Sequence, residues 1–203
     1  MWFIDDQEVQ DDLKKVIMLV AMLLTITACN SGNDVADQLE PDTFSKQDMA
    51  IYKVDNTKGR VSYGMSRKDA EKVLGTGDEA TTNTYTYDSG VGVLYRDDKV
   101  VAITLKRESQ GVYRTARGAE IGMSTTRITE LYGEKHAING TGNYQEYHYD
   151  TETGQFLDEA ALLQNPGSKE ALRARHIFSA AYDGDNNAIE LFLIDGLAAR
   201  TLK

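Results

Sequence analysis

The hydrophobic pattern divides the chain into one apolar run near its start and a series of short periodic segments beyond residue 50. Residues 16–28 carry no charge, but this run is shorter than the about 20 residues that a membrane-spanning helix needs. Beyond residue 50, apolar positions recur either with helical spacing or in short strand-like runs. The pattern predicts an apolar leader followed by a folded domain.

Two short helices are predicted, and each is opened by a Gly-Met-Ser sequence. Residues 64–66 recur as residues 122–124, and apolar positions follow each motif with the i, i+3, i+4 spacing of one helix face. Ser66 and Ser124 are suited to cap the helix N-termini, and Gly75 and Gly133 stand where the helices are expected to end. The matched apolar positions are Ala70, Val73 and Leu74 in the first segment and Ile128, Leu131 and Tyr132 in the second.

Strands rich in aromatic and β-branched residues follow each helix. They are expected at 85–88, 91–95 and 100–105, and again at 147–150, 177–182 and 188–193, with short extended pieces at 51–53 and 112–114. The connections are too short for parallel crossovers. The sequence predicts an α+β fold of two tandem helix-plus-antiparallel-β-meander repeats, at 50–108 and 109–203. The second repeat carries an insertion at 151–176, expected to hold helices near 155–164 and 168–175, which either has a function or protects a sheet edge.

The leader has the features of an export signal. Lys14 and Lys15 precede the apolar run, and Ile26-Thr27-Ala28-Cys29 ends it. This arrangement resembles bacterial lipoprotein signal peptides, which implies cleavage before Cys29 and lipidation of its thiol. A buried thiol in a core helix is the alternative. The acidic residues 1–12 do not suit a signal peptide, so translation from residue 13 is a further hypothesis.

These interpretations give a domain plan and a location. Residues 1–28 form the signal peptide and residues 29–49, which are polar and weakly periodic, form a flexible tether. The expected location is the extracytoplasmic face of the cell membrane, through a lipid anchor at Cys29. The net charge of the 203 residues is −10, which argues against a nucleic-acid partner.

The repeated pattern, taken over about residues 50–195, resembles two protein families. One is the outer-membrane lipoprotein that assists the β-barrel assembly machine, and the other is the β-lactamase inhibitor protein, which has two such units in tandem. The resemblance implies protein binding without catalysis. It transfers no binding residue to this chain.

Few residues form a pattern that suggests chemistry. His148 alternates with Glu146 and Asp150 on a predicted strand, so the three side chains could share a face and bind a metal, or form a solvated polar face. Residues 183–187 begin like a calcium loop, but the glycine and glutamate expected later in such a loop are absent. The chain contains no G-x-S-x-G, P-loop or dinucleotide motif. We therefore expect no enzyme and no cofactor.

Tyrosines are concentrated on the predicted strands. Because tyrosine is enriched in protein interfaces, these side chains are candidates for a docking surface, although tyrosine also packs at the edges of small cores. The leading hypothesis is a lipid-anchored cell-surface lipoprotein that binds a protein partner without catalysis. The alternatives are a metal-dependent envelope enzyme or sensor using His148, and a structural factor in envelope assembly. The candidate binding residues are Tyr85, Tyr87, Tyr95, Tyr147 and Tyr149.

Overall fold

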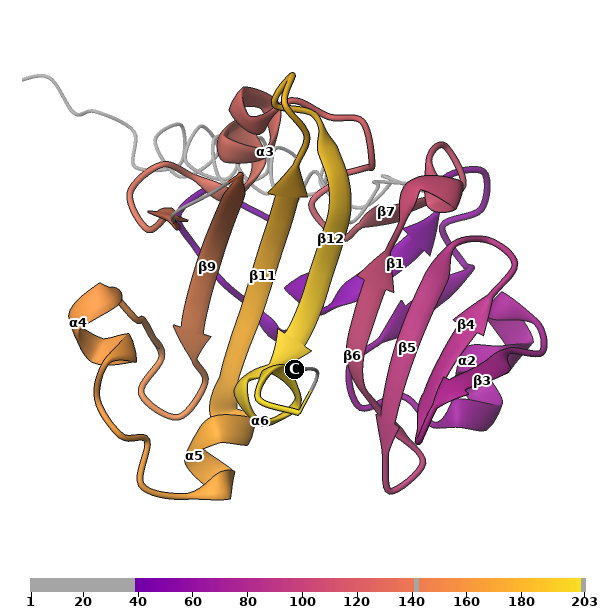
Figure 1. Ribbon diagram of the computed structural model, residues 1–203, viewed down its shortest axis with the longest axis horizontal. Coiled ribbons are helices and arrows are strands. Elements are labelled where there is room, and N and C mark those ends of the chain that lie inside the picture. Colours follow the sequence, from indigo (N-terminus) through magenta and orange to yellow (C-terminus); the bar gives the residue numbers. More distant parts are fainter. Residues whose placement is uncertain (1–38, 141–142, 202–203) are drawn as a thin grey trace, which may run out of the picture. The chain divides into compact units, whose positions relative to one another are not determined.

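The computed structural model describes residues 39–140 and 143–201 (Figure 1). The expected signal peptide, Cys29 and the first part of the expected tether lie outside these residues. The described part is α+β, as predicted, and is dominated by an antiparallel sheet.

The large sheet has nine strands in the order β10-β9-β11-β12-β6-β5-β4-β3, with β8 paired to β9 at one side. All of its pairings are antiparallel, which agrees with the short connections in the sequence. The strands are β3 (Asp78–Thr81), β4 (Thr84–Tyr87), β5 (Val91–Arg96), β6 (Lys99–Leu105), β8 (Ile138–Asn139), β9 (Tyr144–Asp150), β10 (Gln155–Phe156), β11 (Arg175–Tyr182) and β12 (Ala188–Asp195).

The two predicted meanders are joined into this one sheet, whereas the sequence suggested a separate sheet for each. The junction is the pairing of β6 with β12, in which Leu105 lies opposite Leu191 and Ala102 lies opposite Ile194. Both strands are largely buried. Pairing their edges satisfies backbone groups that would otherwise be buried without partners, so the strands join.

A second, three-stranded sheet has the order β2-β1-β7, with β1 at Ala50–Lys53, β2 at Arg60–Ser62 and β7 at Tyr113–Thr115. Strands β1 and β7 correspond, within one residue at each end, to the two extended pieces predicted before the helices. The two strands pair with each other, with Ile51 opposite Thr115. This long-range pairing connects the beginning of the domain to its middle.

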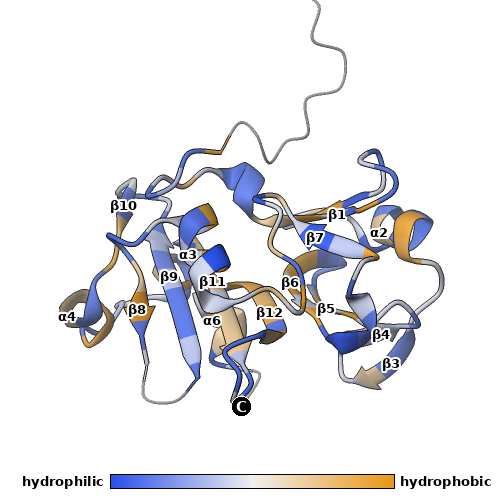
Figure 2. Ribbon diagram, turned by 90° about the horizontal axis from the view of Figure 1, so that it is seen from above, coloured by the Kyte–Doolittle hydropathy of each residue, from blue (hydrophilic) through white to orange (hydrophobic). Residues whose placement is uncertain are grey.

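Helices α2 (Arg67–Leu74) and α3 (Thr125–Tyr132) lie where the Gly-Met-Ser motifs predicted them. The Ser66 and Ser124 side chains accept hydrogen bonds from the backbone N–H groups of Asp69 and Arg127. Both helices and the three-stranded sheet lie on the same side of the large sheet (Figures 1 and 2). The main core lies between them.

The insertion is less helical than expected. Helices α4 (Glu159–Leu162) and α5 (Lys169–Ala174) are shorter than predicted, and β10 occupies the first residues assigned to a helix. A short helix that the sequence did not suggest, α6 (Gly196–Ala199), follows β12. Two 3₁₀ turns, η2 (Lys46–Asp48) and η3 (Arg107–Ser109), complete the described elements.

Hydrophobic residues are concentrated on β5, β6 and β12, whereas β9 is predominantly hydrophilic (Figure 2). The core-facing side chains of the central strands form one cluster with the helices. It includes Val93 of β5, Ile103 of β6, Leu193 of β12 and Phe178 of β11. These four residues lie opposite one another in register across the sheet, so one continuous apolar row forms the floor of the core.

The segment at residues 39–49, here called the N-terminal strap, is held against the folded domain. The Arg117 guanidinium is almost fully buried, pairs with the equally buried Asp48 carboxylate, and donates to the backbone carbonyls of Glu40, Thr43 and Leu131. The prediction of a flexible tether at 29–49 is therefore wrong for residues 39–49. Composition misled the prediction because a polar segment can be ordered by one buried cation.

Candidate functional site

The face of the large sheet that points away from α2, α3 and the three-stranded sheet is the candidate binding surface, seen from the front in Figure 1. Side chains alternate between the two faces of a strand, so this face carries the residues between the core positions. One row crosses the sheet in unbroken register, and we call it the open row. It consists of Thr86, Gly92, Thr104, Phe192, Ser179 and Glu146, on β4, β5, β6, β12, β11 and β9.

A parallel row beside it is apolar and partly covered. Ala102, Ile194 and Ile177 lie opposite one another on β6, β12 and β11, and they cluster with Ala198 of α6. Helix α6 therefore seals one end of this face. Within residues 39–140 and 143–201, no helix covers the open row beyond it (Figure 1).

The part of the open row on β4, β5, β6 and β12 is hollowed around Gly92, which has no side chain. A depression of about 250 Å³ has Thr86, Gly92, Thr104 and Phe192 among its lining residues. Gly92 contributes no side chain, and a Cβ built there would stand 3.5 Å from that of Thr104. The depression thus combines a glycine, threonine side chains and one aromatic ring.

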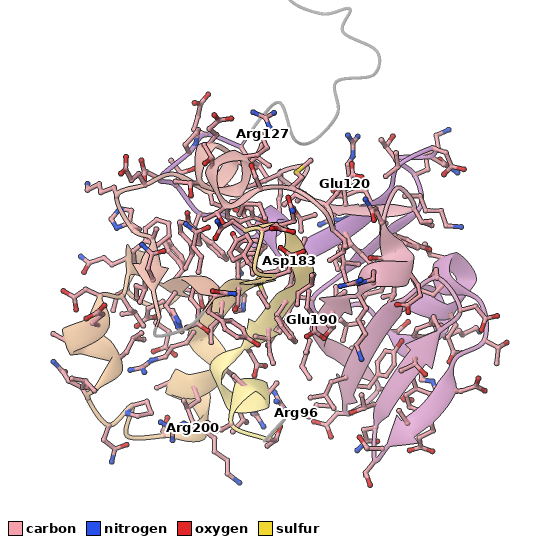
Figure 3. The ribbon with its side chains drawn as sticks, turned by 45° about the horizontal axis from the view of Figure 1, so that its top comes forward. Arg96, Glu120, Arg127, Asp183, Glu190 and Arg200 are labelled. Carbon is pink, nitrogen blue, oxygen red and sulfur yellow. The ribbon has the colours of Figure 1, made fainter. Side chains whose placement is uncertain are left out.

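Two charged groups stand at the side of the depression, Lys106 and Glu190. Burial raises the pKa of the Glu190 carboxyl, and the Lys106 charge acts in the opposite direction. In Figure 3, Glu190 lies beside β12 above Arg96, which lies beside α6. Both signs of charge therefore flank the small-residue floor.

The predicted tyrosine surface does not form. Tyr87, Tyr95 and Tyr147 are only 4%, 3% and 2% exposed and belong to the main core. Their hydroxyl groups are bonded inside the protein: those of Tyr87 and Tyr95 lie 2.7 Å apart, and that of Tyr147 donates to the Gly133 carbonyl. Burial raises the pKa of Tyr147 to about 12. The prediction that these three tyrosines belong to a docking surface is therefore wrong, because their side chains point to the face of the sheet that the helices cover.

The other two candidate tyrosines, Tyr85 and Tyr149, are half-buried, and neighbouring side chains pack on their rings. The Arg67 guanidinium lies 3.6 Å from the centroid of the Tyr85 ring, and Phe44 stacks on Tyr149 at 4.4 Å. They hold α2 and the N-terminal strap in place. Neither ring presents a free face comparable to the open row.

The proposed metal-binding trio does not come together as a ligand set. The His148 Nε2 atom is 2.7 Å from the Glu146 carboxylate, but Asp150 accepts hydrogen bonds from the backbone N–H groups of Glu152 and Thr153. The hydrogen bond to His148 lowers the pKa of Glu146, against the effect of burial. Among residues 39–140 and 143–201, no group of three or more histidine, cysteine or acidic side chains is arranged to hold a metal ion.

The segment that resembles a calcium loop is a hairpin turn between β11 and β12. The Asp183 carboxylate accepts from the backbone N–H groups of Asp185 and Asn187, 3.0 Å and 2.9 Å away. Asp183 thus satisfies the turn's own donors.

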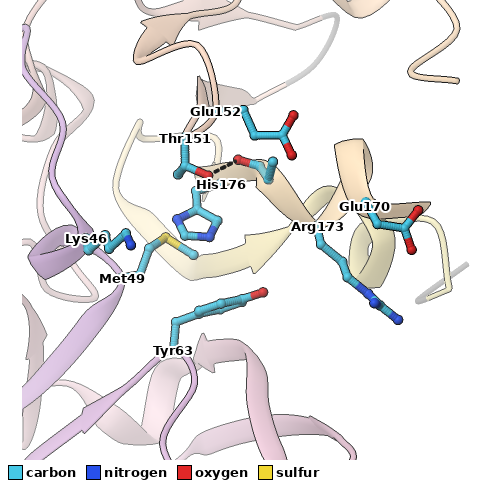
Figure 4. Close-up of a pocket in the computed structure, with 9 residues that line it drawn as sticks. Lys46, Met49, Tyr63, Thr151, Glu152, Glu170, Arg173 and His176 are labelled. Atoms are coloured by element: carbon cyan, nitrogen blue, oxygen red, sulfur yellow. Dashed lines mark hydrogen bonds between the residues drawn. The ribbon is translucent and has the colours of Figure 1, made fainter. Parts of the chain in front are cut away.

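One further cavity lies at the end of β11 that adjoins α5, and it was missed by the sequence analysis. It is lined by His176 and Tyr63, together with side chains of the N-terminal strap and α5 (Figure 4). The Tyr63 hydroxyl donates to the fully buried Asp195 carboxylate at 2.8 Å, and Arg96 holds the same carboxylate. A single histidine in a strand gives no sequence signal for such a cavity, because the other walls come from distant segments.

Comparison of the chain with models of protein families, with curated proteins and with solved structures gives no match. Within the part of the chain that the structure describes, none of the helices has the length and hydrophobicity required to cross a membrane. The family resemblance suggested by the sequence therefore stays a prediction.

Proposed function

We propose that this chain is a lipid-anchored, non-catalytic protein-binding module on the extracytoplasmic face of a bacterial cell membrane. Its partner would dock on the open row of the large sheet. The observation that carries the proposal is a six-strand row of mostly small and polar side chains that none of the described helices covers.

The chemistry of the open row suits a protein surface as partner. Interfaces combine an apolar centre with polar groups at the rim. Here Phe192 and the Gly92 backbone supply the centre, and the hydroxyl groups of Thr86 and Thr104 supply hydrogen-bonding groups beside it. The depression has room for a side chain of the partner but is smaller than the usual cavity for a drug-sized ligand.

We further propose that residues 50–108 and 109–203 are two versions of one ancestral unit. In support, Ser66 and Ser124 each cap a helix and each bridge to the last hairpin of their own segment, at Lys99 and Asn187. The pairing of β6 with β12 would then be the contact between the two units, and the open row would span both.

The experiment is capture of a partner from membranes, with the full chain as bait and covalent crosslinking to retain weak complexes. We expect a specific partner for the parent chain and loss of capture for Thr104→Arg, because a long cation would fill the depression. Thr126→Arg is the matched control, since Thr126 is exposed on α3, on the other side of the sheet. Equal capture by both variants would remove the open row as the docking surface.

The lipid anchor requires its own test, because Cys29 lies outside the described residues. We predict that Cys29→Ala abolishes incorporation of a fatty-acid analogue and leaves the chain either uncleaved or released from the lipid fraction. Metabolic labelling followed by membrane fractionation measures both effects. Unchanged acylation of the variant would contradict the anchor.

A further inference from the structure

The cavity at the end of β11 has a floor of aromatic and apolar side chains. It measures about 430 Å³, and His176, Tyr63 and Met49 lie together along it (Figure 4), with Ala174 also among its lining residues. The rings of His176 and Tyr63 are 4.7 Å apart and tilted by 53°. Cavities of roughly 300–1,000 Å³ are typical of small-molecule sites, so this one is large enough for a small organic molecule.

His176 is the unusual member of the floor. Its side chain is 6% exposed, and its buried Nδ1 atom has no hydrogen-bond partner among the residues that the structure describes. Leaving a buried polar atom unpaired is energetically unfavourable. A group bound in the cavity would bring a polar partner to this imidazole, which the surrounding protein does not supply.

The charges that act on the floor leave a positive excess. Asp195 acts on both His176 and Tyr63, but its carboxylate is held by Arg96. The remaining charges that act on these two rings are those of Lys46 and Arg173. Both cations line the cavity, and neither forms an ion pair with the acidic side chains of the described residues.

The acidic residues at the mouth do not cancel this excess at the floor. Glu152 and Glu170 also line the cavity and, like Lys46 and Arg173, are exposed. Arg173 acts on the Glu170 carboxyl as well, but in Figure 4 both carboxylates point away from the His176 ring. Lys46 stands on one side of the rings and Arg173 on the other. An anion between them would meet two cations across an apolar floor.

We propose that this cavity binds a small organic carboxylate, with its carboxylate group between Lys46 and Arg173 and its apolar body against Tyr63 and Met49. The cavity lies at the end of β11 that adjoins α5, apart from the open row. The proposal does not depend on the docking function. A free small acid fits better than a macromolecule because the mouth is framed by the strap and by α5.

Benzoate is the probe, and benzamide, which has the same ring without the charge, is the comparison. The full chain is labelled with ¹⁵N-histidine, held in detergent, and titrated while the ring resonances of His176 are followed by NMR. We expect saturable shifts at His176 with benzoate and binding at least about threefold weaker with benzamide, the size of effect that one exposed ion pair supplies.

Two surface variants test the cations without disturbing the core. Lys46→Gln and Arg173→Gln should each weaken benzoate binding about threefold or more. Lys169→Gln, on the same helix as Arg173 but outside this cavity, should leave it unchanged. The proposal is overturned if benzamide binds as well as benzoate, if Lys169→Gln weakens binding as much as Arg173→Gln does, or if His176 shows no saturable shift up to about 20 mM benzoate.

Discussion

Arg117 is the single side chain on which the N-terminal strap depends most. It is 2% exposed, is paired with a 1% exposed Asp48, and satisfies backbone carbonyls from the strap and from α3. A cation with this many acceptors at one buried point fixes several chain segments at once. Removing it would leave the Asp48 carboxylate buried without its counter-charge.

We predict that Arg117→Met destabilises the protein by about 3–5 kcal/mol, the usual effect of breaking one side of a buried ion pair. Urea unfolding followed by circular dichroism measures this change. The comparison variant is Arg127→Gln, which breaks an exposed pair with Glu130 on α3 and should cost less than about 1 kcal/mol. Similar losses for both variants would contradict the role assigned to Arg117.

His176 gives the domain a specific dependence on pH. Burial lowers the pKa of its imidazole; the Asp195 carboxylate acts in the opposite direction, and the Lys46 charge lowers the pKa further. The rings of Phe44 and Tyr63 also face it. In the folded state His176 therefore resists protonation, whereas in the unfolded chain it takes up a proton near its ordinary pKa of about 6.5.

The sign of the effect follows from this difference. Stability from neutral His176 is fully present above about pH 6.5 and is lost as the pH falls towards the lower folded-state pKa. We predict that the free energy of unfolding decreases between about pH 7.5 and 5.5 and that His176→Gln removes part of this decrease. An identical pH dependence in parent and variant, measured by urea unfolding, would be inconsistent with the assignment.

At the scale of elements, Gly133 and Gly75 end equivalent helices but have different neighbours. Both have backbone angles in a region almost restricted to glycine, with φ of 98° and 88°. A Cβ at Gly75 would meet nothing within 4 Å, whereas one at Gly133 would collide with Asp42 of the strap. Asp42 is also bonded to α3 and the residues after it, through the Tyr132 carbonyl and the Lys135 N–H.

The two glycines form a matched pair of variants. Gly75→Ala should cost about 1–3 kcal/mol from backbone strain alone. We predict that Gly133→Ala costs more, and that it selectively increases hydrogen exchange at Asp42 and Lys135, because the strap must move. Equal costs, with no change in exchange at these two sites, would show that the strap does not pack on the end of α3.

The helices could be predicted from the sequence because their signals are local. Ser66 and Gly75 lie at the two ends of one helix, so the residues at its ends predict where it begins and where it stops. The joining of β6 to β12 could not be predicted in the same way, since it pairs residues far apart in the chain.

For a related reason, the sequence could not show to which face of the sheet the strand tyrosines point. Alternation assigns Tyr85 and Tyr87 to one face of their strand, but it does not say which face the helices will cover. His176 was missed because its neighbours in the cavity come from the strap, β2's end and α5. Local patterns predicted the elements, and long-range packing decided the site.

At the scale of the described domain, one face of the large sheet is used for stability and the other is available. The core face packs against α2, α3 and the three-stranded sheet, and α6 covers only one end of the opposite face. The open row lies on that opposite face, with Thr86 exposed, Thr104, Phe192 and Glu146 partly exposed, and Gly92 and Ser179 buried. Its docking role is the central claim of the proposed function.

Site-specific photocrosslinking on living cells tests that claim most directly. A photoreactive phenylalanine analogue replaces Phe192 in the open row, and the same analogue replaces Thr126 on α3 as the control position. We predict one discrete crosslinked protein from position 192, lost when Thr104→Arg is added, and no such product from position 126. The same crosslinked protein at both positions, or its persistence in the presence of Thr104→Arg, would contradict docking on the open row.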